Sequence, residues 1–198
     1  MSLTENAVIP DPSNNDLPQS IENLPHNGSM NTRWKPSVTV AAVIEESGRF
    51  LLVEEHTPEG LRLNNPAGHL DPGESPAEAC ARETLEETAY QFTPQALIGV
   101  YLARFQRSLP DQIGPAMDDI TYLRFAFCGS LGARDALRTL DTGIVGTLWL
   151  TADEIRANTH RLRSPLVLQC MEDYLVGQRF GLELIHTHPS VQAFQPRT

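Results

Sequence analysis

Residues 68–90 read GHLDPGESPAEACARETLEETAY, in which turn-forming residues lead into a helix. Ser75 is a preferred helix N-cap, Pro76 suits the first helical position, and Glu78 completes a capping box. The spacing predicts a helix that begins at Pro76 and ends near residue 87 or 88. The segment before it is dense in glycine and proline, which predicts a loop of tight turns.

Three carboxylates share one face of this predicted helix. Glu83, Glu86 and Glu87 stand at positions i, i+3 and i+4, so they project from the same side. Like charges at this spacing repel one another, and the negative end of the helix dipole disfavours them further. Hard divalent cations prefer oxygen ligands, so the spacing indicates a Mg²⁺ or Mn²⁺ site. The alternative is a solvated helix face, which acid-rich helices commonly present.

The same stretch fits a longer pattern that reaches back to Gly68. Five residues separate Gly68 from Glu74, and seven more separate Glu74 from Arg82, which opens the run RETLEETAY. This pattern resembles the signature of the Nudix hydrolases, G-x5-E-x7-R-E-U-x-E-E-x-G-U, where U is a bulky aliphatic residue. The fixed glycine, glutamate and arginine positions before the closing glycine are all present.

Three positions depart from the signature. Thr84 and Tyr90 stand where aliphatic residues are usual, and neither side chain is expected to carry chemistry. Ala89 replaces the closing glycine, which normally caps the helix in the left-handed conformation. An alanine there must leave that conformation or accept strain.

The resemblance implies a fold and a set of roles. The fold is the α/β (α+β) Nudix fold, a mixed β-sheet sandwiched between helices. Glu74 and Arg82 are implied to support the loop and the helix as an ion pair. The implied metal ligands are the carbonyl oxygen of Gly68 and the catalytic carboxylates of Glu83, Glu86 and Glu87.

The resemblance also implies a reaction, in which a metal-activated water attacks phosphorus and a carboxylate takes the proton. Glu83 is the first choice for this general base, because some relatives use that position. The alternatives are Glu54, Glu55, Asp118 and Asp119.

Phosphates that the metal does not reach need basic side chains, and the planar fork of arginine suits them. The candidate substrate ligands are Arg124, Arg104 and Arg163. Arg124 lies in the middle of a predicted strand, where an arginine needs a partner.

Segments outside this signature, which we call the box, extend the resemblance to one bacterial branch of the family, the NudJ-type phosphatases. These segments are KP at 35–36, NPAGHL at 65–70, LRF at 123–125, LRSPLV at 162–167 and GQRF at 177–180. The branch implies cleavage of phosphoanhydride bonds in nucleoside di- and triphosphates and in pyrimidine or thiamine pyrophosphates. The alternatives are another nucleoside diphosphate derivative, such as ADP-ribose or a dinucleotide polyphosphate, and a non-catalytic nucleotide-sensing module.

Strand-forming stretches surround the box, because β-branched and aromatic residues are enriched there. The predicted strands are 37–44, 49–54, 97–105, 120–131 and 146–150. The first two are expected to form a hairpin through a turn at 45–48, and polar loops are expected at 56–62 and 106–119. Further helices are expected after the caps Thr151 and Ser164.

The predicted organisation has three parts. Residues 1–33, rich in Asn, Ser and Pro, are expected to be a disordered segment. Residues 34–185 are expected to form the hydrolase domain, and 186–198 a loose tail.

Charge limits the partners of this chain. It has 198 residues and a formal net charge of −10, from 25 acids against 15 bases. Bulk nucleic-acid binding depends on basic patches, so no nucleic-acid partner is expected. Six of the acids lie within residues 71–87, where a divalent cation would bring the charge into contact with phosphate. The expected partner is therefore a small phosphoanhydride substrate.

The rest of the composition suggests a compartment. The longest clean apolar run, residues 38–44, is too short to cross a bilayer, and the N-terminus lacks a secretory signal. Three widely spaced cysteines without a C-x-x-C pair fit a reducing environment. We therefore expect a cytoplasmic monomer or homodimer without a membrane partner.

Overall fold

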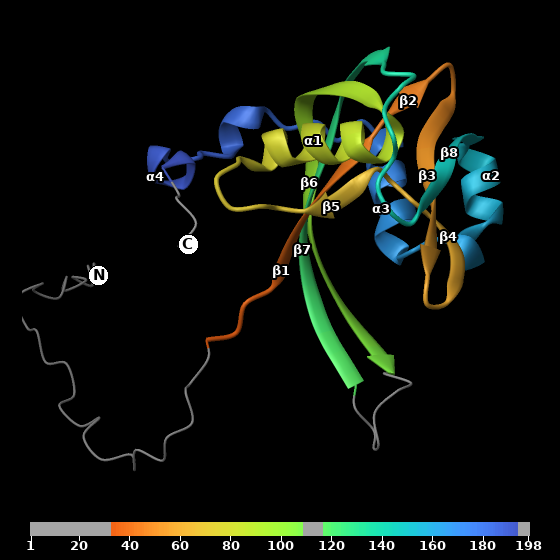
Figure 1. Ribbon diagram of the computed structural model, residues 1–198, viewed down its shortest axis with the longest axis horizontal. Coiled ribbons are helices and arrows are strands. Elements are labelled where there is room, and N and C mark those ends of the chain that lie inside the picture. Colours follow the sequence, from red (N-terminus) through yellow and green to blue (C-terminus); the bar gives the residue numbers. More distant parts are fainter. Residues whose placement is uncertain (1–32, 109–116, 194–198) are drawn as a thin grey trace, which may run out of the picture. The chain divides into compact units, whose positions relative to one another are not determined.

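The computed structural model describes residues 33–108 and 117–193, and its helices and strands belong to the compact unit that begins at Lys35. Two four-stranded sheets organise this unit (Figure 1). The first sheet has the strand order β5-β1-β7-β6, and β1 and β7 run parallel while the other neighbours are antiparallel. Its strands are β1 (Ser37–Val43), β5 (Ala67–His69), β6 (Tyr90–Ser108) and β7 (Met117–Arg134).

The second sheet is built around one strand, β3 (Arg49–Thr57), which pairs with all three others. All three pairings are antiparallel. The neighbours of β3 are β2 (Glu45–Glu46), β4 (Gly60–Asn64) and β8 (Ile144–Thr151).

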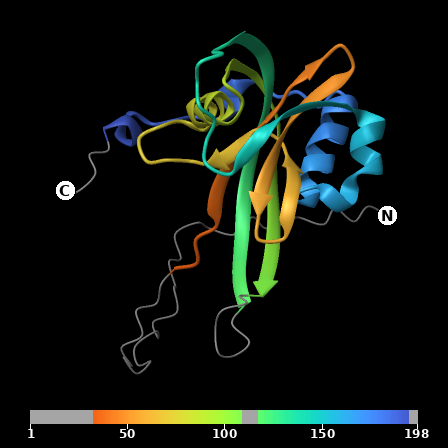
Figure 2. The same ribbon diagram turned by 45° about the vertical axis from the view of Figure 1, so that its right-hand side comes forward.

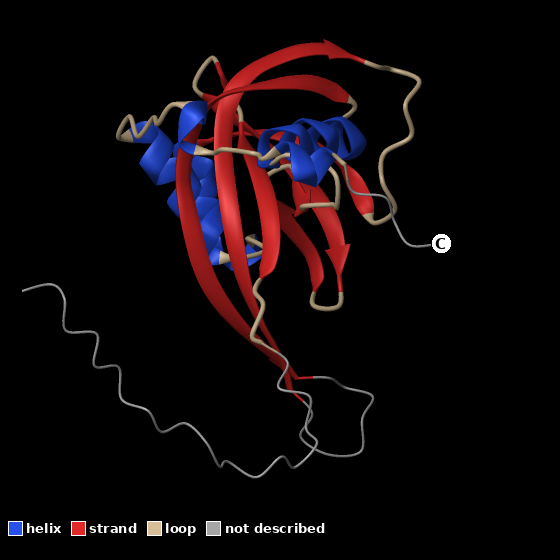
Figure 3. Ribbon diagram, turned by 90° about the vertical axis from the view of Figure 1, so that its left-hand side faces the viewer, coloured by secondary structure: helices blue, strands red, loops and turns tan. Residues whose placement is uncertain are grey.

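Helices cover both faces of the first sheet (Figures 2 and 3). Helix α1 (Pro76–Thr88) buries Ala79 and Cys80 against Val40 and Ala42 of β1. Alternation along the strand turns Val43 to the opposite side, where a second apolar core includes residues of the second sheet and of two further helices. These helices are α2 (Ala152–Ala157) and α3 (Pro165–Leu175). The remaining elements are a short helix α4 (Pro189–Gln192) and two 3₁₀ turns, Thr159–Arg161 and Leu182–Leu184. The predicted mixed α+β architecture, with sheet between helices, is confirmed.

Both ends of α1 follow from their residues. The Ser75 hydroxyl accepts from the Glu78 amide at 3.2 Å, and the Glu78 carboxylate accepts from the Ser75 amide at 2.8 Å. At the other end, Ala89 lies in the left-handed region with φ 61° and donates its amide to Leu85 at 3.0 Å. The helix therefore accepts backbone strain at the position where the signature has glycine.

Two loop predictions are wrong, and one hairpin is shorter than predicted. The residues at 56–62 form the hairpin between β3 and β4, in which backbone pairing holds a mostly exposed, polar segment. The described parts of the predicted loop at 106–119 belong to β6, which runs to Ser108, and β7, which starts at Met117. The predicted hairpin into 49–54 is present but short: Ile44 and β2 pair with β3, whereas β1 belongs to the first sheet.

Parts of the predicted organisation lie outside the residues that the structure describes. Residues 1–32 and 194–198 are not among the described residues, so the disordered segment stays a prediction. Of the predicted tail, Pro189–Gln192 forms α4. In the part of the chain that the structure describes, no helix has the length and apolar character needed to cross a membrane.

Candidate active site

Arg82 connects the loop before α1 to the carboxylates on the helix. Its Nε and Nη2 atoms bind both oxygens of Glu74, at 2.9 and 2.7 Å. Its Nη1 atom lies 2.8 Å from Glu83 Oε1 and 2.9 Å from Glu86 Oε2. Nη2 also donates to the carbonyl oxygen of His69 at 3.0 Å. Hydrogen bonds to these carboxylates raise the pKa of Arg82, so the guanidinium stays charged and fixes two of the three helix glutamates.

Gly68 lies directly against Glu83. A Cβ atom built on Gly68 would overlap the Glu83 carboxylate. The backbone of Gly68 does not require a positive φ, so the need for glycine here comes from the close approach of a side chain. The strand β5 and the helix α1 can therefore meet at this point only without a side chain on residue 68.

Glu87 is, like Glu83, a buried carboxylate of the group. Its Oε2 atom accepts the Ala67 amide at 2.8 Å, and the residue is 9% exposed. The pKa of Glu87 is raised to about 8, mainly by burial and also by the charges of Glu83, Glu55 and Asp141, against the lowering effect of that amide. Burial also raises the pKa of Glu83, which Arg82 opposes. These carboxylates crowd negative charge into a space that lacks sufficient compensation.

The donor set fits a hard divalent cation. Carboxylates and a backbone carbonyl are the ligands that Mg²⁺ and Mn²⁺ prefer, and a cation would offset both the burial and the repulsion that raise these pKa values. Among the described residues, no three Asp, Glu, His or Cys side chains converge closely enough to hold an ion as they stand. In this arrangement the Nη1 atom of Arg82 bridges Glu83 and Glu86, at 2.8 and 2.9 Å.

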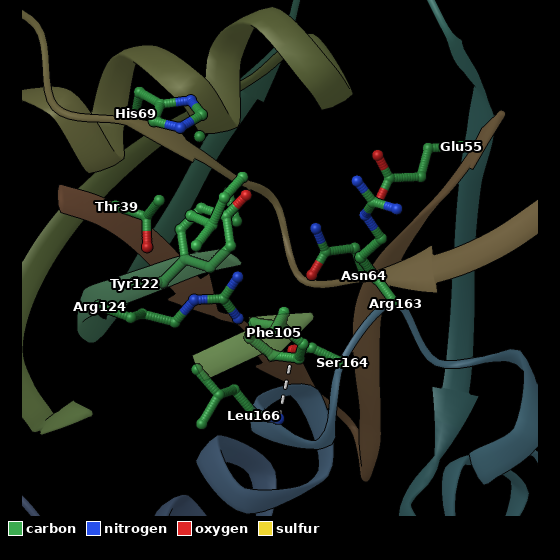
Figure 4. A pocket seen from close by; sticks show the side chains of 13 residues that line it. Thr39, Glu55, Asn64, His69, Phe105, Tyr122, Arg124, Arg163, Ser164 and Leu166 are labelled. Carbon is green, nitrogen blue, oxygen red and sulfur yellow. Dashed lines mark hydrogen bonds and ion pairs between the residues drawn. The ribbon is translucent and has the colours of Figure 1, made fainter. Parts of the chain in front are cut away.

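A cavity of about 210 Å³ adjoins this carboxylate group. Ala67 and Gly68 belong to both, since they contact Glu87 and Glu83 and also line the cavity. The pairing of β5, β1 and β7 places His69, Thr39 and Arg124 in one row across the first sheet. Figure 4 shows the lining side chains, with Thr39, Tyr122 and Arg124 on one side of the view and Asn64, Glu55 and Arg163 on the other. The remaining lining residues are Phe105, Ile120, Ser164 and Leu166.

Several polar groups in the cavity wall have no hydrogen-bond partner within the described ranges. They are Nε and Nη1 of Arg124, Oγ1 of Thr39, Oδ1 of Asn64 and Oε1 of Glu55. Arg124 is 8% exposed, and burial lowers its pKa because a charged guanidinium is costly away from water. Phe105 and Tyr122 form an edge-on aromatic pair with ring centroids 5.7 Å apart.

The structure brings most of the predicted site residues to one place. The six box residues meet where β5 contacts α1, and Arg124 and Arg163 line the adjoining cavity. Arg163 lies at the rim, with its Nε atom 3.5 Å from Glu55 and its Nη1 atom 3.6 Å from Glu59. The box residues are Gly68, Glu74, Arg82, Glu83, Glu86 and Glu87.

Other predicted residues lie apart from the cavity. Arg104 binds Asp119 across the β6–β7 hairpin through two hydrogen bonds of 2.7 and 2.5 Å, on an exposed face. Its neighbour Phe105 lines the cavity, and alternation along β6 turns Arg104 to the other face. Glu54 pairs with Arg161 at 2.6 Å. The side chain of Asp118 falls outside the described residues.

Sequence reasoning missed Thr39, Asn64, Tyr122 and Asp141. The first three reach the cavity through strand register, which leaves no local signal in the sequence. Asp141 lies near the box because its amide donates to the Glu86 carbonyl at 3.1 Å. The acidity of this residue alone would not have distinguished it from other surface acids.

Comparisons with known proteins agree with this geometry. A family model described as NUDIX domain matches residues 33–169. The chain is 38% identical over 152 residues to phosphatase NudJ of Escherichia coli K12, which covers 77% of this chain and 92% of that protein. A NUDIX hydrolase structure from Nitrosomonas europaea is 47% identical, with a TM-score of 0.66, over 78% of this chain and 98% of that one. The MutT protein of Methanosarcina mazei Go1, at 22% identity and a TM-score of 0.52 over 73% and 97%, shares the fold alone.

Proposed function

The chain belongs to the Nudix hydrolase family, and from this premise we propose that it is a Mg²⁺-dependent phosphohydrolase of nucleoside di- and triphosphates and of pyrimidine and thiamine pyrophosphates. The observation that carries the proposal is the crowded group of helix carboxylates that opens onto a polar cavity. The similarity to phosphatase NudJ supports the phosphatase activity, and the substrate range follows from the branch that the sequence segments resemble.

The metal ligands in this proposal are the carbonyl oxygen of Gly68 and the carboxylates of Glu83, Glu86 and Glu87. When bound, a divalent cation supplies a Lewis acid and lowers the pKa of a bound water. Arg82 and Glu74 support the metal ligands. Their ion pair fixes the loop against α1, and Arg82 orients two of the glutamates. Mn²⁺ would satisfy the same donor set.

Glu83 remains our first choice for the general base. It is held by Gly68 on one side and Arg82 on the other, so its carboxylate is fixed beside the cavity. The competing base is Glu55, which lines the cavity itself and faces Arg163. Glu54 and Asp119 are weaker candidates because Arg161 and Arg104 already bind them.

Arg163 is the residue that we assign to substrate phosphate. Its partners Glu55 and Glu59 lie at 3.5 and 3.6 Å, so an incoming phosphate can compete for the guanidinium. Arg124 also contacts the substrate, from deeper in the cavity. We leave Arg104 out of the substrate site because it binds Asp119 on the other face of β6.

A hydrolysis panel tests this proposal. The substrates are nucleoside di- and triphosphates, thiamine pyrophosphate, ADP-ribose and diadenosine polyphosphates, each with Mg²⁺ and with EDTA. We expect Mg²⁺-dependent orthophosphate release from the mononucleotides and from thiamine pyrophosphate. Release of AMP from ADP-ribose alone would replace the proposed substrates with the ADP-ribose alternative. No hydrolysis of any compound would favour a nucleotide-sensing module, against which the complete set of box carboxylates argues.

We also propose a cytoplasmic location. Cys80, Cys128 and Cys170 are buried and unpaired in the described structure, which suits a reducing compartment. A monomer and a homodimer are equally compatible with a site built from one chain.

A further inference from the structure

The second half of β6 has an outer edge without a pairing partner in the described parts of the chain. Strand β6 ends the first sheet, and its inner side pairs with β7 along its length. On the outer side, Leu97 exchanges two backbone hydrogen bonds with Phe180, at 2.9 and 2.8 Å. From Gly99 to Ser108, no described residue forms a backbone hydrogen bond with the outer edge. Such a row of free N–H and C=O groups is a template for another strand.

The features that protect an edge strand are confined to the first half of β6. Natural edge strands avoid pairing through proline, bulges or charged side chains. Pro94 and all three register shifts of the β6–β7 pair lie at or before Gly99. From Gly99 onward the register is regular, and Arg104 is the first charged residue. The ends of β6 and β7 also extend beyond the helices (Figures 1 and 3), so no helix covers this edge.

Apolar side chains are exposed beside this edge. Strand register places Val40, Phe125 and Val100 in one row across β1, β7 and β6, on the face that α1 packs against. Val40 is fully buried, whereas Val100 is 51% exposed. In the neighbouring row, Leu102 of β6 is 64% exposed. The helix therefore covers the middle of the sheet and leaves an apolar strip on β6, which is typical of a surface that binds another protein.

A second copy of the same strand fits this edge. The segment at 99–103 carries no charge, so two copies can pair without like charges directly opposite one another. An antiparallel pair of identical strands has two-fold symmetry, as a homodimer interface requires. With the axis at Leu102, this leucine lies opposite its own copy and Val100 lies opposite Arg104. The Arg104 charge is paired with Asp119 of β7, so its aliphatic stem is free to cover Val100.

We propose that β6 is a homodimer interface, in which residues 99–105 of two chains pair antiparallel about a two-fold axis at Leu102. The pairing joins the first sheets of two copies into one continuous sheet and removes Val100 and Leu102 from water. No box residue lies in this interface, so the inference does not depend on the proposed reaction. One paired edge buries less surface than an obligate interface, and we expect a dissociation constant on the order of 10 µM.

Sedimentation equilibrium of the full chain tests the proposal. Loaded at a series of concentrations from about 1 to 300 µM, the protein should change from the mass of one chain to the mass of two. A single-chain mass throughout this range would overturn the proposal. A mass above that of two chains would also overturn it, because a two-fold strand pair closes at two copies.

Charged substitutions at Leu102 test the arrangement of the strands. Leu102→Lys and Leu102→Glu each place like charges opposite one another, so each variant alone should dimerise about 100-fold more weakly. An equimolar mixture of the two should dimerise again, because lysine then lies opposite glutamate. Leu137→Lys is the matched control, since Leu137 is 95% exposed in the connection between β7 and β8 and should not affect dimerisation.

The outcomes of these variants are distinct. Unchanged dimerisation of Leu102→Lys would place the interface elsewhere and overturn the proposal. A mixture that stayed monomeric would overturn the antiparallel arrangement about Leu102. Leu102 is exposed in the single chain, so all variants should melt at the temperature of the unsubstituted chain, and thermal unfolding checks this.

Hydrogen exchange measured by mass spectrometry identifies what covers the edge. Amides in residues 99–105 should exchange more slowly as the protein concentration rises, while those of β8 should not change. Slow exchange that is the same at every concentration would mean that another part of the same chain pairs with β6, and would overturn the second copy as its occupant. Because none of these measurements uses hydrolysis, their outcome is separate from that of the hydrolysis panel.

Discussion

The two sides of the Ala67–Gly68 segment treat their polar groups in opposite ways. Toward α1, Arg82 bonds to Glu74, Glu83 and Glu86 and to a backbone carbonyl. Toward the cavity, Arg124 has two nitrogen atoms without partners among the described residues, although it is the more buried arginine. An arginine that is hydrogen-bonded within its own protein fixes the positions of its partners. A buried arginine with unbonded N–H groups raises the free energy of the ligand-free site, and a ligand that accepts from these groups stabilises it. The first region therefore positions the chemistry, and the second selects what enters.

Removal of one box carboxylate gives the largest expected effect. Glu86→Gln should lower kcat/KM with Mg²⁺ by about 10³-fold, because a divalent cation loses one of its charged ligands. The free energy of unfolding should change by less than about 1 kcal/mol, since Glu86 is partly exposed and its ion pair with Arg82 is of the i,i+4 kind. Steady-state kinetics and urea denaturation measure the two quantities.

A matched control for this variant is Glu46→Gln, which removes an exposed carboxylate from β2. It should leave both activity and its Mg²⁺ dependence unchanged. A Glu86→Gln enzyme, or a Glu87→Gln enzyme, that kept full activity at the same Mg²⁺ concentration would remove these residues from the ligand set.

The buried carboxylate should make the metal-free protein less stable as the pH rises. The pKa of Glu87 is about 8 in the folded chain against 4.5 when unfolded, so the folded state binds more protons between these values. The free energy of unfolding should therefore fall by about 2–4 kcal/mol from pH 5 to pH 9 in EDTA. Glu83 acts in the same direction, while the lowered pKa of Glu74 acts only below about pH 4.5. Urea denaturation at a series of pH values measures this slope.

Two conditions should flatten that slope. Glu87→Gln removes the titrating group, so its unfolding free energy should change much less across the same range. Saturating Mg²⁺ should also reduce the fall, because it binds the ionised carboxylates of the folded chain. A wild-type slope of the opposite sign in EDTA would show that Glu87 is ionised and well compensated without metal.

A methyl group at residue 68 should disturb both regions. Gly68→Ala places a Cβ atom where the Glu83 carboxylate lies, so we expect a loss of about 1–3 kcal/mol in stability and about 10²-fold in kcat/KM. Gly146→Ala in β8 is the matched control. Among the described residues nothing lies within 4 Å of a Cβ atom there, so stability should change by less than about 0.5 kcal/mol. Equal effects of the two variants would show that Glu83 can move away without cost.

The box region could be predicted from sequence because its determinants are local. Ser75, Pro76 and Glu78 mark the start of α1, and the predicted end near residue 88 matches Thr88. The spacing of Glu83, Glu86 and Glu87 fixes one helix face for any straight helix. The sequence allowed two outcomes at Ala89, a strained left-handed backbone or a different conformation. The structure has the left-handed backbone, and Ala89 is fully buried.

The cavity could not be predicted because it depends on strand register. Thr39 and Arg124 are partners across β1 and β7, which are far apart in the chain and pair in parallel. No local pattern announces such a pairing, and a shift by one residue would turn both side chains to the other face. Sequence reasoning also assigned 56–62 and the described parts of 106–119 to loops, because their polar residues follow one another without the alternation that marks a strand; backbone pairing with a neighbouring strand makes them strands instead.

A pair of threonine variants gives the smallest expected effect and the most direct comparison of the two regions. In α1, the buried Thr84 hydroxyl donates to the Cys80 carbonyl at 2.7 Å, so Thr84→Val should lower the free energy of unfolding by about 0.5–1.5 kcal/mol. In the cavity wall, the Thr39 hydroxyl has no partner within the described structure, so Thr39→Val should raise it by about 0.5–1 kcal/mol. The same Thr39→Val protein should bind cytidine 5′-monophosphate more weakly, by titration calorimetry. If the two variants change the free energy of unfolding in opposite directions, β1 retains a destabilising hydroxyl for its ligand. If both variants lower the free energy of unfolding, ordered water already satisfies Thr39. The two regions would then differ less than their side-chain contacts suggest.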